Sequence, residues 1–249
     1  MAYKPNVCIL KTDGTNCDNE TSYAFEKAGG ICKTVHLNQL RNGADKLFNY
    51  QILAISGGFS YGDDIASGKV LALELTTFLR DQLRYFVALG KLIIGICNGF
   101  QVLVRTGLLP FGNIGKMEAT LAHNSSGHFE CRWVNLEINS SSPCVFTLGM
   151  AGVKFLQIAH GEGKFYADGQ ALERIEKENL AVIRYLGANP NGSLNCIAGI
   201  CDPTGRIFGL MPHPERFVEL TQYPEWRRFP ENVKPHGLKI FENAVDYFK

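Results

Sequence analysis

The first half of the chain alternates short apolar runs with amphipathic segments, and this rhythm constrains the fold more than any other feature of the sequence. Residues 6–11 (NVCILK) and 91–96 (KLIIGI) have the continuous apolar character of strands buried on both faces. Residues 18–30 and 69–90, which lie between them, place apolar side chains at helical spacing. Strands alternating with helices predict an α/β fold with a parallel sheet covered on both faces.

The two amphipathic segments predict helices with recognisable ends. Asp18 is the candidate N-cap of the first helix, and Gly29-Gly30 ends it. The second segment predicts one long helix over 69–90, closed by Gly90. Its expected inward-facing residues are Leu75, Phe78, Leu79, Leu83, Phe86 and Val87.

From about Met117 the pattern changes to closely spaced strands with turn-like joins such as NPNGS and DPTG. These strands are predicted to extend the sheet with antiparallel pairs, and residues 237–249 read as a final amphipathic helix. The segments concerned are 131–138, 153–167, 180–186, 195–202 and 206–213. A length of 249 residues fits one domain, 1–249.

Composition excludes several classes of function. The net charge is +1, so no nucleic-acid partner is expected. No apolar run approaches the roughly 18 residues of a membrane span, and the first residues lack a secretory signal. Eight cysteines without a CxxC pair favour neither a zinc site nor a disulfide framework. We therefore expect a cytoplasmic protein with no membrane contact and no bound metal.

The run KLIIGI ends at Cys97, which is bracketed by Gly95 and Gly99. The sequence Gly-Ile-Cys-Asn-Gly has the spacing of a nucleophile elbow, a sharp strand-to-helix turn that presents an exposed sulfur. A following helix would place Cys97 at a helix N-terminus, which favours a thiolate. The N–H of Asn98 would point to the same place and could stabilise an oxyanion. A buried cysteine between two packing glycines is the alternative.

A cysteine nucleophile needs a base, and His213 is the candidate. It lies two residues before Glu215 in the segment MPHPER. In an extended segment, residues two apart face the same way, so the carboxylate could orient the imidazole. The alternative is a surface turn with a solvated histidine and glutamate. For a metal site, the sequence offers no third ligand at a typical spacing.

The segment GGFSYGDD follows the predicted strand 51–56. It lacks the GxxxxGK[ST] pattern of a phosphate-binding loop. A second oxyanion donor, the N–H of Gly58 or of Phe59, is a better use for it. A flexible turn is the alternative.

Together these segments resemble the class I (triad) glutamine amidotransferases over nearly the whole chain. Within that family they are most similar to the glutaminase components of phosphoribosylformylglycinamidine synthases. The resemblance rests on DGTNCDNETSYAFEKAGG, GGFSYGDD, GICNGFQVL, NSSGHFECRWV, HGEGKFYA, NPNGSLNCIAGI and LMPHPERF. It implies a flavodoxin-like three-layer α/β sandwich with a mixed, mainly parallel sheet.

The resemblance also implies roles for single residues. Cys97 would attack the amide carbon of glutamine, His213 would act as base and then acid, and Glu215 would orient His213. A γ-glutamyl thioester would form and hydrolyse to glutamate. Gln101 matches a position that helps hold glutamine, and His160, in HGEG, is expected to shape the pocket.

Ammonia from such a reaction is useful only beside an acceptor. The resemblance implies partner subunits of the PurL and PurS types, which make an intermediate of purine biosynthesis. No cofactor is expected in this chain, and ATP and Mg²⁺ are expected on the partner synthetase. The alternatives are a triad glutaminase that serves another synthetase, a cysteine hydrolase of related fold, and a non-catalytic docking subunit.

Overall fold

The computed structural model describes residues 3–228 and 234–249. The strands are β1 (Asn6–Lys11), β2 (Ile31–His36), β3 (Ile52–Ile55), β4 (Leu92–Ile96), β5 (Ala119–Ala122), β6 (Glu130–Ile138), β7 (Val153–His160), β8 (Lys164–Ala167), β9 (Ala181–Tyr185), β10 (Ile197–Cys201) and β11 (Ile207–Leu210). The helices are α1 (Asp18–Lys27), α2 (Leu37–Arg41), α3 (Lys69–Phe78), α4 (Arg80–Ala88), α5 (Asn98–Thr106), α6 (Gly169–Lys177) and α7 (Leu238–Asp246).

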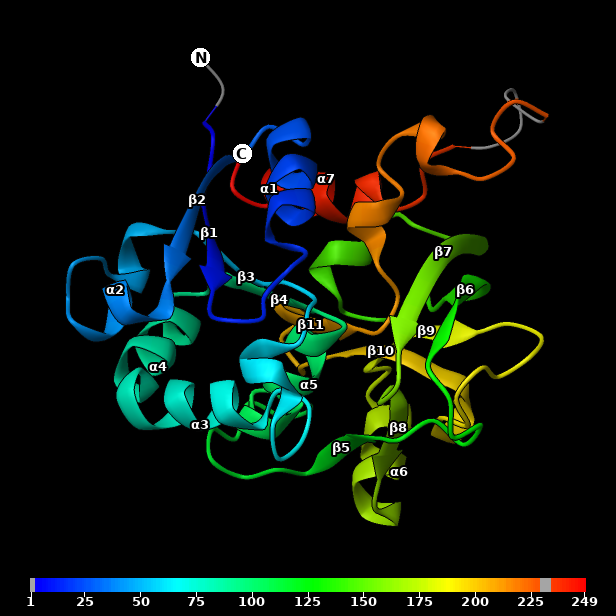
Figure 1. Cartoon of the computed structure of the whole chain (residues 1–249), viewed down its shortest axis with the longest axis horizontal. Coiled ribbons are helices and arrows are strands. Elements are labelled where there is room, and N and C mark those ends of the chain that lie inside the picture. Colours follow the sequence, from blue (N-terminus) through cyan, green and yellow to red (C-terminus); the bar gives the residue numbers. More distant parts are fainter. Residues whose placement is uncertain (1–2, 229–233) are drawn as a thin grey trace.

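The main sheet has nine strands within the described ranges, in the order β2-β1-β3-β4-β11-β10-β9-β6-β7 (Figure 1). The first five strands in this order are mutually parallel, and each following pair is antiparallel. The order of the parallel half, with β1 between β2 and β3, is that of a flavodoxin-like sheet. The predicted mixed α/β sheet is therefore confirmed.

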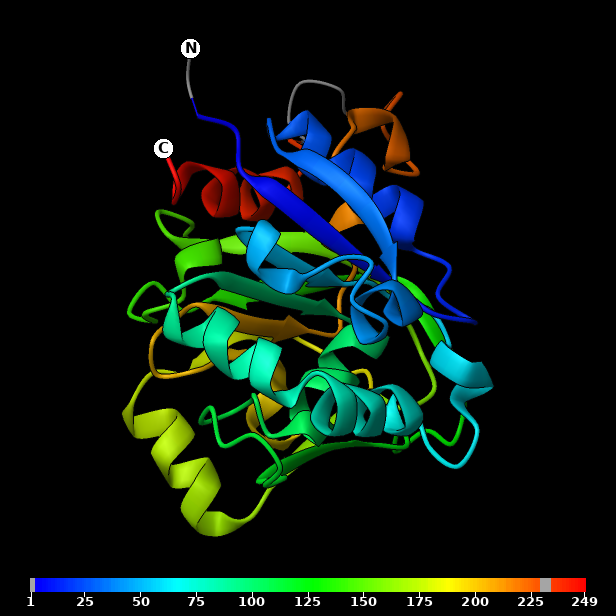
Figure 2. The same ribbon diagram turned by 90° about the vertical axis from the view of Figure 1, so that its left-hand side faces the viewer.

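Helices cover both faces of this sheet. Figure 2 shows α1 and α7 on one side and α3, α4 and α5 on the other. In agreement with this view, α1 contacts α7, and α3 packs against α5. The three-layer arrangement is confirmed. No helix in residues 3–228 and 234–249 is both long enough and apolar enough to cross a membrane.

Three neighbouring strands of the sheet, β3, β4 and β11, explain the continuous apolar runs of the sequence. All residues of β3, β4 and β11 are buried, because helices lie against both faces of the sheet. The apolar composition of these strands excludes water from both sides of the sheet centre. Their carboxyl ends lie together, which makes this edge the natural place for a site.

The long helix predicted over 69–90 is wrong, because the chain breaks at Leu79 (φ −116°, ψ 11°) into α3 and α4. The break lets α3 pack against α5 while α4 packs against the 3₁₀ turn at residues 47–49. Leu79 is buried at the break, but Phe78 is 48% exposed instead of facing the core. The Arg41 guanidinium lies 3.8 Å from the centre of the Phe78 ring.

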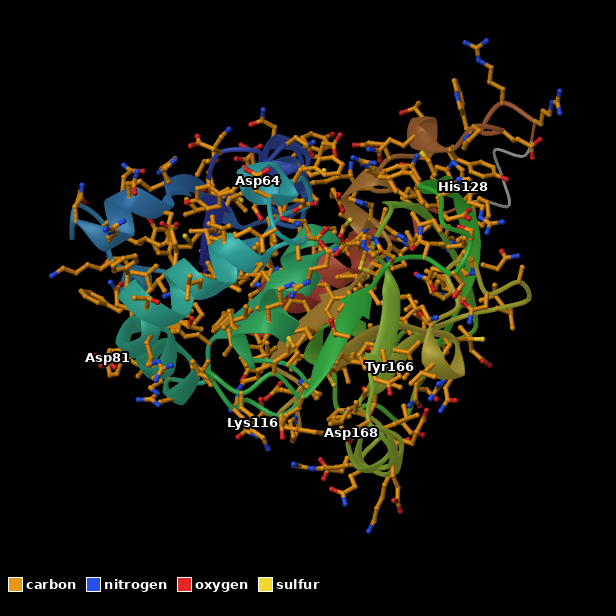
Figure 3. All side chains as sticks on the ribbon, turned by 60° about the horizontal axis from the view of Figure 1, so that its bottom comes forward. Asp64, Asp81, Lys116, His128, Tyr166 and Asp168 are labelled. Carbon is orange, nitrogen blue, oxygen red and sulfur yellow. The ribbon has the colours of Figure 1, made fainter. Side chains whose placement is uncertain are left out.

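The predicted strand over 153–167 is also wrong. Its two halves are β7 and β8, which belong to different sheets and are separated by the turn at residues 161–163. β8 pairs with β5 instead of extending the main sheet. Helix α6 was not predicted from the sequence. The Asp168 side chain, labelled in Figure 3, caps its first turn by accepting from the Ala171 N–H at 2.8 Å.

Asp18 is not the N-cap of α1. Cys17 occupies that position, and no side chain caps the helix there. Asp18 is instead buried in the first turn and forms a 2.6 Å ion pair with Lys11 of β1. A carboxylate in the first turn still complements the helix dipole. The placement of Cys17 matters more, because it brings a second sulfur to the carboxyl edge of the sheet.

Candidate active site

Cys97 lies in a strained turn between β4 and α5. Its φ of 52° and ψ of −105° are outside the regions that a residue with a side chain normally adopts. Such a conformation costs about 1–3 kcal/mol and persists only where the surroundings enforce it. Here the N–H of Cys97 donates to the Leu210 carbonyl at 2.8 Å, which ties the turn to the end of β11.

The two glycines that flank Cys97 are required by close backbone packing. A Cβ on Gly95 would lie 2.5 Å from the Gly99 carbonyl oxygen. A Cβ on Gly99 would lie 1.9 Å from the carbonyl oxygen of Ile55 in β3. The sequence Gly-x-Cys-x-Gly therefore reflects contacts between α5 and the neighbouring strand, as an elbow requires.

The Cys97 side chain faces a cavity of about 260 Å³. The residue is only 6% exposed, so the expectation of an exposed sulfur is wrong: the cavity, and not the open surface, surrounds it. The Sγ of Cys97 lies 3.5 Å from the Ala159 carbonyl of β7. The cavity is lined by Asn16, Cys17, Gly58, Phe59, Cys97, Phe129, Cys131, Ala159, His213 and Arg216.

His213 reaches this cavity from the end of β11, although more than a hundred residues separate it from Cys97. The backbone N–H of His213 donates to the Gln157 carbonyl at 2.8 Å, and the two residues form an isolated antiparallel bridge. β7 is the last strand in the sheet order, yet this bridge brings it against the segment that follows β11. Segments after β3, β4 and β11 and the end of β7 thus meet around one cavity.

The imidazole of His213 is paired with Glu215. Nδ1 of His213 lies 2.5 Å from Oε1 of Glu215, and both side chains are buried. The segment is not fully extended as predicted, because Pro214–Arg216 forms a 3₁₀ turn after an extended His213. This turn directs the carboxylate back toward the ring.

Electrostatics favour the charged form of His213. Burial alone would lower the pKa of His213, but the nearby Glu215 carboxylate and the Cys97 sulfur raise this pKa well above its usual value. Nε2 of His213 and Oε2 of Glu215 are buried without a hydrogen-bond partner among the described residues. Nε2 is therefore available for exchange of a proton inside the cavity.

The loop after β3 distinguishes between the two candidate oxyanion donors. The N–H of Phe59 donates to the Gly14 carbonyl at 2.9 Å and is therefore occupied. The N–H of Gly58 has no acceptor among the described residues. Gly58 has a φ of 145°, and a Cβ there would lie 2.7 Å from the Gly14 oxygen, so the position suits only glycine.

Asn98 and Gln101 use their side chains inside the protein. The Asn98 amide donates to Asp63 Oδ1 at 2.9 Å and to Gln101 Oε1 at 3.0 Å. The Gln101 amide donates to the Glu162 carbonyl at 2.5 Å. Neither side chain lines the cavity, although Asn98 is the first residue of α5 and its N–H has no acceptor within the helix. The two amides connect α5 to the loops at residues 60–63 and 161–163.

His160 is buried and does not line the cavity. Its Nδ1 lies 3.0 Å from Oδ1 of Asn124, and a Cβ on Gly163 would lie 2.4 Å from its ring. Burial and the nearby charge of His213 lower the pKa of His160 to about 4. The ring is therefore neutral at pH 7, and its contacts hold the turn at residues 161–163.

Cys17 and Arg216 also line the cavity, although neither was among the predicted site residues. Arg216 Nη2 donates to Cys17 Sγ at 3.2 Å. Both residues lie in motifs that carry the family resemblance, DGTNCD and PHPER. These motifs were the signal in the sequence from which a role for the two residues could have been predicted. Only the fold brings these two motifs together, because 199 positions separate them.

Cys17, His213 and Glu215 form the one group in the described residues that could hold a metal ion. One ligand atom from each lies within 4.8 Å of the others. The fold thus supplies the third ligand that the sequence spacing did not. The Arg216 guanidinium on the Cys17 sulfur disfavours a cation at this place, and Glu215 already occupies Nδ1 of His213. The arrangement fits proton transfer better than metal binding.

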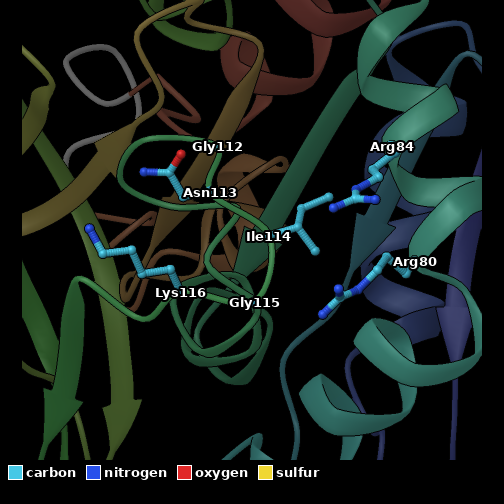
Figure 4. A pocket seen from close by; sticks show the side chains of 7 residues that line it. All are labelled: Arg80, Arg84, Gly112, Asn113, Ile114, Gly115 and Lys116. Carbon is cyan, nitrogen blue, oxygen red and sulfur yellow. The ribbon is translucent and has the colours of Figure 1, made fainter.

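A larger hollow of about 670 Å³ lies elsewhere, between α4 and the loop at residues 112–116 (Figure 4). Arg80 and Arg84 extend from α4 toward this loop. None of the predicted site residues lines it. Volume alone therefore does not locate the candidate site.

Comparisons with known proteins show the family of the chain. The model of the CobB/CobQ-like glutamine amidotransferase domain matches residues 4–248. The chain is 46% identical to phosphoribosylformylglycinamidine synthase subunit PurQ of Dehalococcoides mccartyi, over 98% of each chain. It is 43% identical to the PurQ subunit of Methanococcus maripaludis, over 98% of this chain and 97% of that one.

Two solved structures are also similar to this chain. A chain in the structure of PurLQS from Thermotoga maritima superposes with a TM-score of 0.77 and 33% identity, covering 99% of this chain and 100% of that one. The glutaminase domain of Trypanosoma brucei CTPS, solved with acivicin, has a TM-score of 0.60 at 13% identity and covers 98% and 94%. The second likeness shows a shared fold only. With relatives this similar over nearly its whole length, the chain belongs to the PurQ family of glutamine amidotransferases.

Proposed function

We propose that Cys97, His213 and Glu215 are the catalytic triad with which this glutamine amidotransferase converts glutamine to glutamate and ammonia. The observation that supports this most strongly is the strained turn at Cys97, which shares one cavity with the buried His213–Glu215 pair. A nucleophile, a base and an orienting carboxylate are the three parts that amide hydrolysis through a covalent intermediate requires.

The first half of the reaction forms a thioester. The Cys97 thiolate attacks the side-chain amide carbon of glutamine, a C–S bond forms, and the carbonyl electrons move to oxygen. When this tetrahedral intermediate collapses, the C–N bond breaks and the leaving nitrogen takes a proton from Nε2 of His213. Ammonia leaves, and His213 remains neutral.

The second half hydrolyses the thioester. Neutral His213 takes a proton from water as the water oxygen attacks the carbonyl carbon. The C–S bond then breaks, glutamate leaves, and the thiolate and the imidazolium are restored. Throughout, Glu215 holds the imidazole through Nδ1 and stabilises its charged form.

The oxyanion of each tetrahedral intermediate is assigned to the N–H groups of Gly58 and Asn98. Both lie next to the cavity, and neither has an acceptor that satisfies it within the described chain. Phe59 was an equal candidate from the sequence, but its N–H is bound to Gly14. Loss of one donor of this kind typically costs about 2.7–4 kcal/mol of transition-state stabilisation.

Gln101 and His160 are assigned indirect roles in binding glutamine. Their side chains hold the turn at residues 161–163, through the Glu162 carbonyl and through Asn124 and Gly163. Backbone groups of this turn are the candidates for contact with the amino acid part of glutamine. The two side chains then shape the pocket without contacting the substrate.

Ammonia has to reach an acceptor before it is protonated and lost, so a partner is part of the proposal. The similar chains are named as PurQ subunits, and the Thermotoga structure is of PurLQS. We assign ammonia transfer to synthetase subunits of the PurL and PurS types, in de novo purine biosynthesis. ATP and Mg²⁺ bind to that partner synthetase, which converts formylglycinamide ribonucleotide to its amidine.

The rim of the cavity is the candidate docking surface for this partner. Phe59 and Phe129 line the cavity and are nevertheless 47% and 53% exposed. Apolar side chains in this position can exclude water around a passage for ammonia. A synthetase docked there would cover the opening through which the product leaves.

The test measures glutamate release from glutamine by the purified chain, alone and with PurL-type and PurS-type subunits of the same organism. We expect slow hydrolysis alone, a rate that rises in the complex with ATP and the nucleotide substrate, and no hydrolysis by Cys97→Ser. Equal rates with and without partners would contradict the assigned partnership and favour a glutaminase that serves another synthetase. No hydrolysis in any mixture would favour a hydrolase of other substrates or a docking subunit.

A further inference from the structure

A second cysteine lies beside the imidazole of His213, and the reaction steps above do not use it. Cys17 is 1% exposed and lines the same cavity as Cys97 and His213. Its Sγ, a ring nitrogen of His213 and a carboxylate oxygen of Glu215 all lie within 4.8 Å of one another. A buried thiol in this position is a neighbour of the triad itself.

The backbone holds the Cys17 sulfur in place from two sides. The N–H of Cys17 donates to the Gly57 carbonyl at 3.1 Å, which ties it to the loop after β3. Its carbonyl accepts from the hydroxyl of Thr21 at 2.7 Å and from the Thr21 N–H at 3.0 Å. The position of the sulfur is therefore set by the sheet edge and by the first turn of α1.

Gly57 lies against both the sulfur and the imidazole. A Cβ on Gly57 would lie 3.3 Å from Cys17 Sγ and 2.8 Å from Cε1 of His213. The absence of a side chain at this position thus leaves room for the ring and the thiol on the same patch of backbone. The ring of His213 therefore lies close to the backbone at residue 57 and beside the Cys17 sulfur.

Polar contacts fix the Cys17 side chain as well. Its Sγ accepts from Arg216 Nη2 at 3.2 Å and donates to Asn16 Oδ1 at 3.2 Å. Arg216 in turn lies 3.3 Å from the Glu20 carboxylate. The thiol therefore presents a sulfur lone pair to Arg216, and the Glu20 carboxylate partly offsets the guanidinium charge.

The groups that act on His213 come from several elements. Glu215 and Arg216 belong to the segment after β11, Cys97 to the elbow, Cys17 to the start of α1, and His160 to the end of β7. Of these, Glu215, Cys97 and Cys17 each favour the imidazolium. His160 carries no charge at neutral pH, because its pKa is lowered to about 4 by burial and by His213.

We propose that Cys17 is a positioning residue, whose sulfur, held by Arg216, fixes the orientation of the His213 ring during the attack by Cys97. This inference rests on the proposed triad. It assigns a function to the cysteine of the DGTNCD segment and to the arginine of PHPER, which pair across the cavity. Cys17 acts through His213 and does not itself react with glutamine.

The test compares Cys17→Ala, Cys17→Ser and a control, Cys32→Ala, a partly buried cysteine outside the cavity. For Cys17→Ala we expect kcat to fall about 10-fold with KM for glutamine nearly unchanged. Removal of a group that favours the imidazolium lowers the pKa of His213, so the alkaline limb of the kcat profile should move to lower pH by about half a unit or more. Cys17→Ser keeps a hydrogen-bonding group, so its kcat and the position of its alkaline limb should lie close to those of the wild type.

A second readout does not depend on activity. Nuclear magnetic resonance of labelled histidine reports the titration of His213 directly in the wild type and in Cys17→Val, which fills the space of the thiol without its sulfur and can be measured even if Cys17→Ala fails to fold. An unchanged titration and pH profile in folded Cys17→Ala or Cys17→Val would show that Cys17 only fills space. A raised KM at constant kcat would make it a substrate contact, which also overturns the inference. Failure of the triad itself would appear separately, as hydrolysis that persists in Cys97→Ser.

Discussion

Gly99 is packed so closely on Ile55 that a Cβ at residue 99 would lie 1.9 Å from the Ile55 carbonyl oxygen. This contact joins the first turn of α5 to β3, one strand away from the strand that carries Cys97. It sets the helix N-terminus, and with it the N–H of Asn98, at a fixed height above the sheet. The elbow is therefore a product of packing between backbones.

Gly99→Ala should destabilise the protein strongly, because backbone has to move to relieve the overlap. We expect a loss of about 3 kcal/mol or more in the free energy of unfolding, together with loss of glutamine hydrolysis. Gly169→Ala is the matched control, since nothing lies within 4 Å of a Cβ there and the residue starts α6. Denaturant titration of both variants measures the difference, and equal stability would contradict the packing argument.

Glu215→Gln should keep the size of the side chain and remove the charge that stabilises the imidazolium. We expect kcat to fall about 10²–10⁴-fold. Because Glu215 raises the pKa of His213, its loss should move the alkaline limb of the pH–rate profile to lower pH. Glu219→Gln, at a partly exposed glutamate paired with Lys27, is the control and should leave the profile in place. An unshifted limb in Glu215→Gln would separate this carboxylate from the reacting imidazole.

His160 should make stability depend on pH. Its folded-state pKa of about 4 lies below the usual 6.5, so the unfolded chain binds more protons between these values and stability is lost as pH falls through this window. The loss attributable to His160 should approach about 3 kcal/mol at pH 4. His160→Gln should flatten the dependence, whereas His123→Gln should not, because that side chain is 86% exposed. Unfolding curves measured from pH 7 to pH 4 give the slope, and equal slopes in wild type and His160→Gln would rule out this origin.

Gln101→Ala should weaken binding of glutamine more than it slows the chemical step. The variant loses the bond to the Glu162 carbonyl and leaves that partly buried carbonyl without its partner. A cost of about 1–1.5 kcal/mol corresponds to roughly a 10-fold rise in KM. Gln170→Ala, on the exposed side of α6, is the control. A fall in kcat at constant KM would instead place Gln101 in the chemical step.

Much of the fold was predictable because its strands are buried on both faces. Runs such as ILAI and LIIGI are apolar throughout, and the segment around Cys97 has glycines at the two positions where backbone packs on backbone. The break at Leu79 was not predictable from periodicity, since the apolar spacing continues across it and only packing against α5 and residues 47–49 favours two helices. α6 carried a readable signal, the capping residue Asp168 before apolar positions at helical spacing.

The candidate site was predictable where one segment holds several of its residues. PHPER carries His213 and Glu215 together, so their contact follows from local geometry. The choice between Gly58 and Phe59 was not predictable, because it depends on which N–H the distant Gly14 carbonyl accepts from. The pairing of Cys17 with Arg216, and the approach of β7 to His213, depend on the order of strands in the sheet.

The most direct test of the triad is covalent labelling with a diazo-ketone analogue of glutamine, followed by mass spectrometry of the digested protein. Three cysteines, Cys17, Cys97 and Cys131, line the cavity, so the position of the label is informative. A single adduct on Cys97, absent from Cys97→Ser and slowed by added glutamine, is the result that the proposed mechanism predicts. A label on Cys17 or Cys131, or no label at all, would contradict the assignment of Cys97 as the nucleophile.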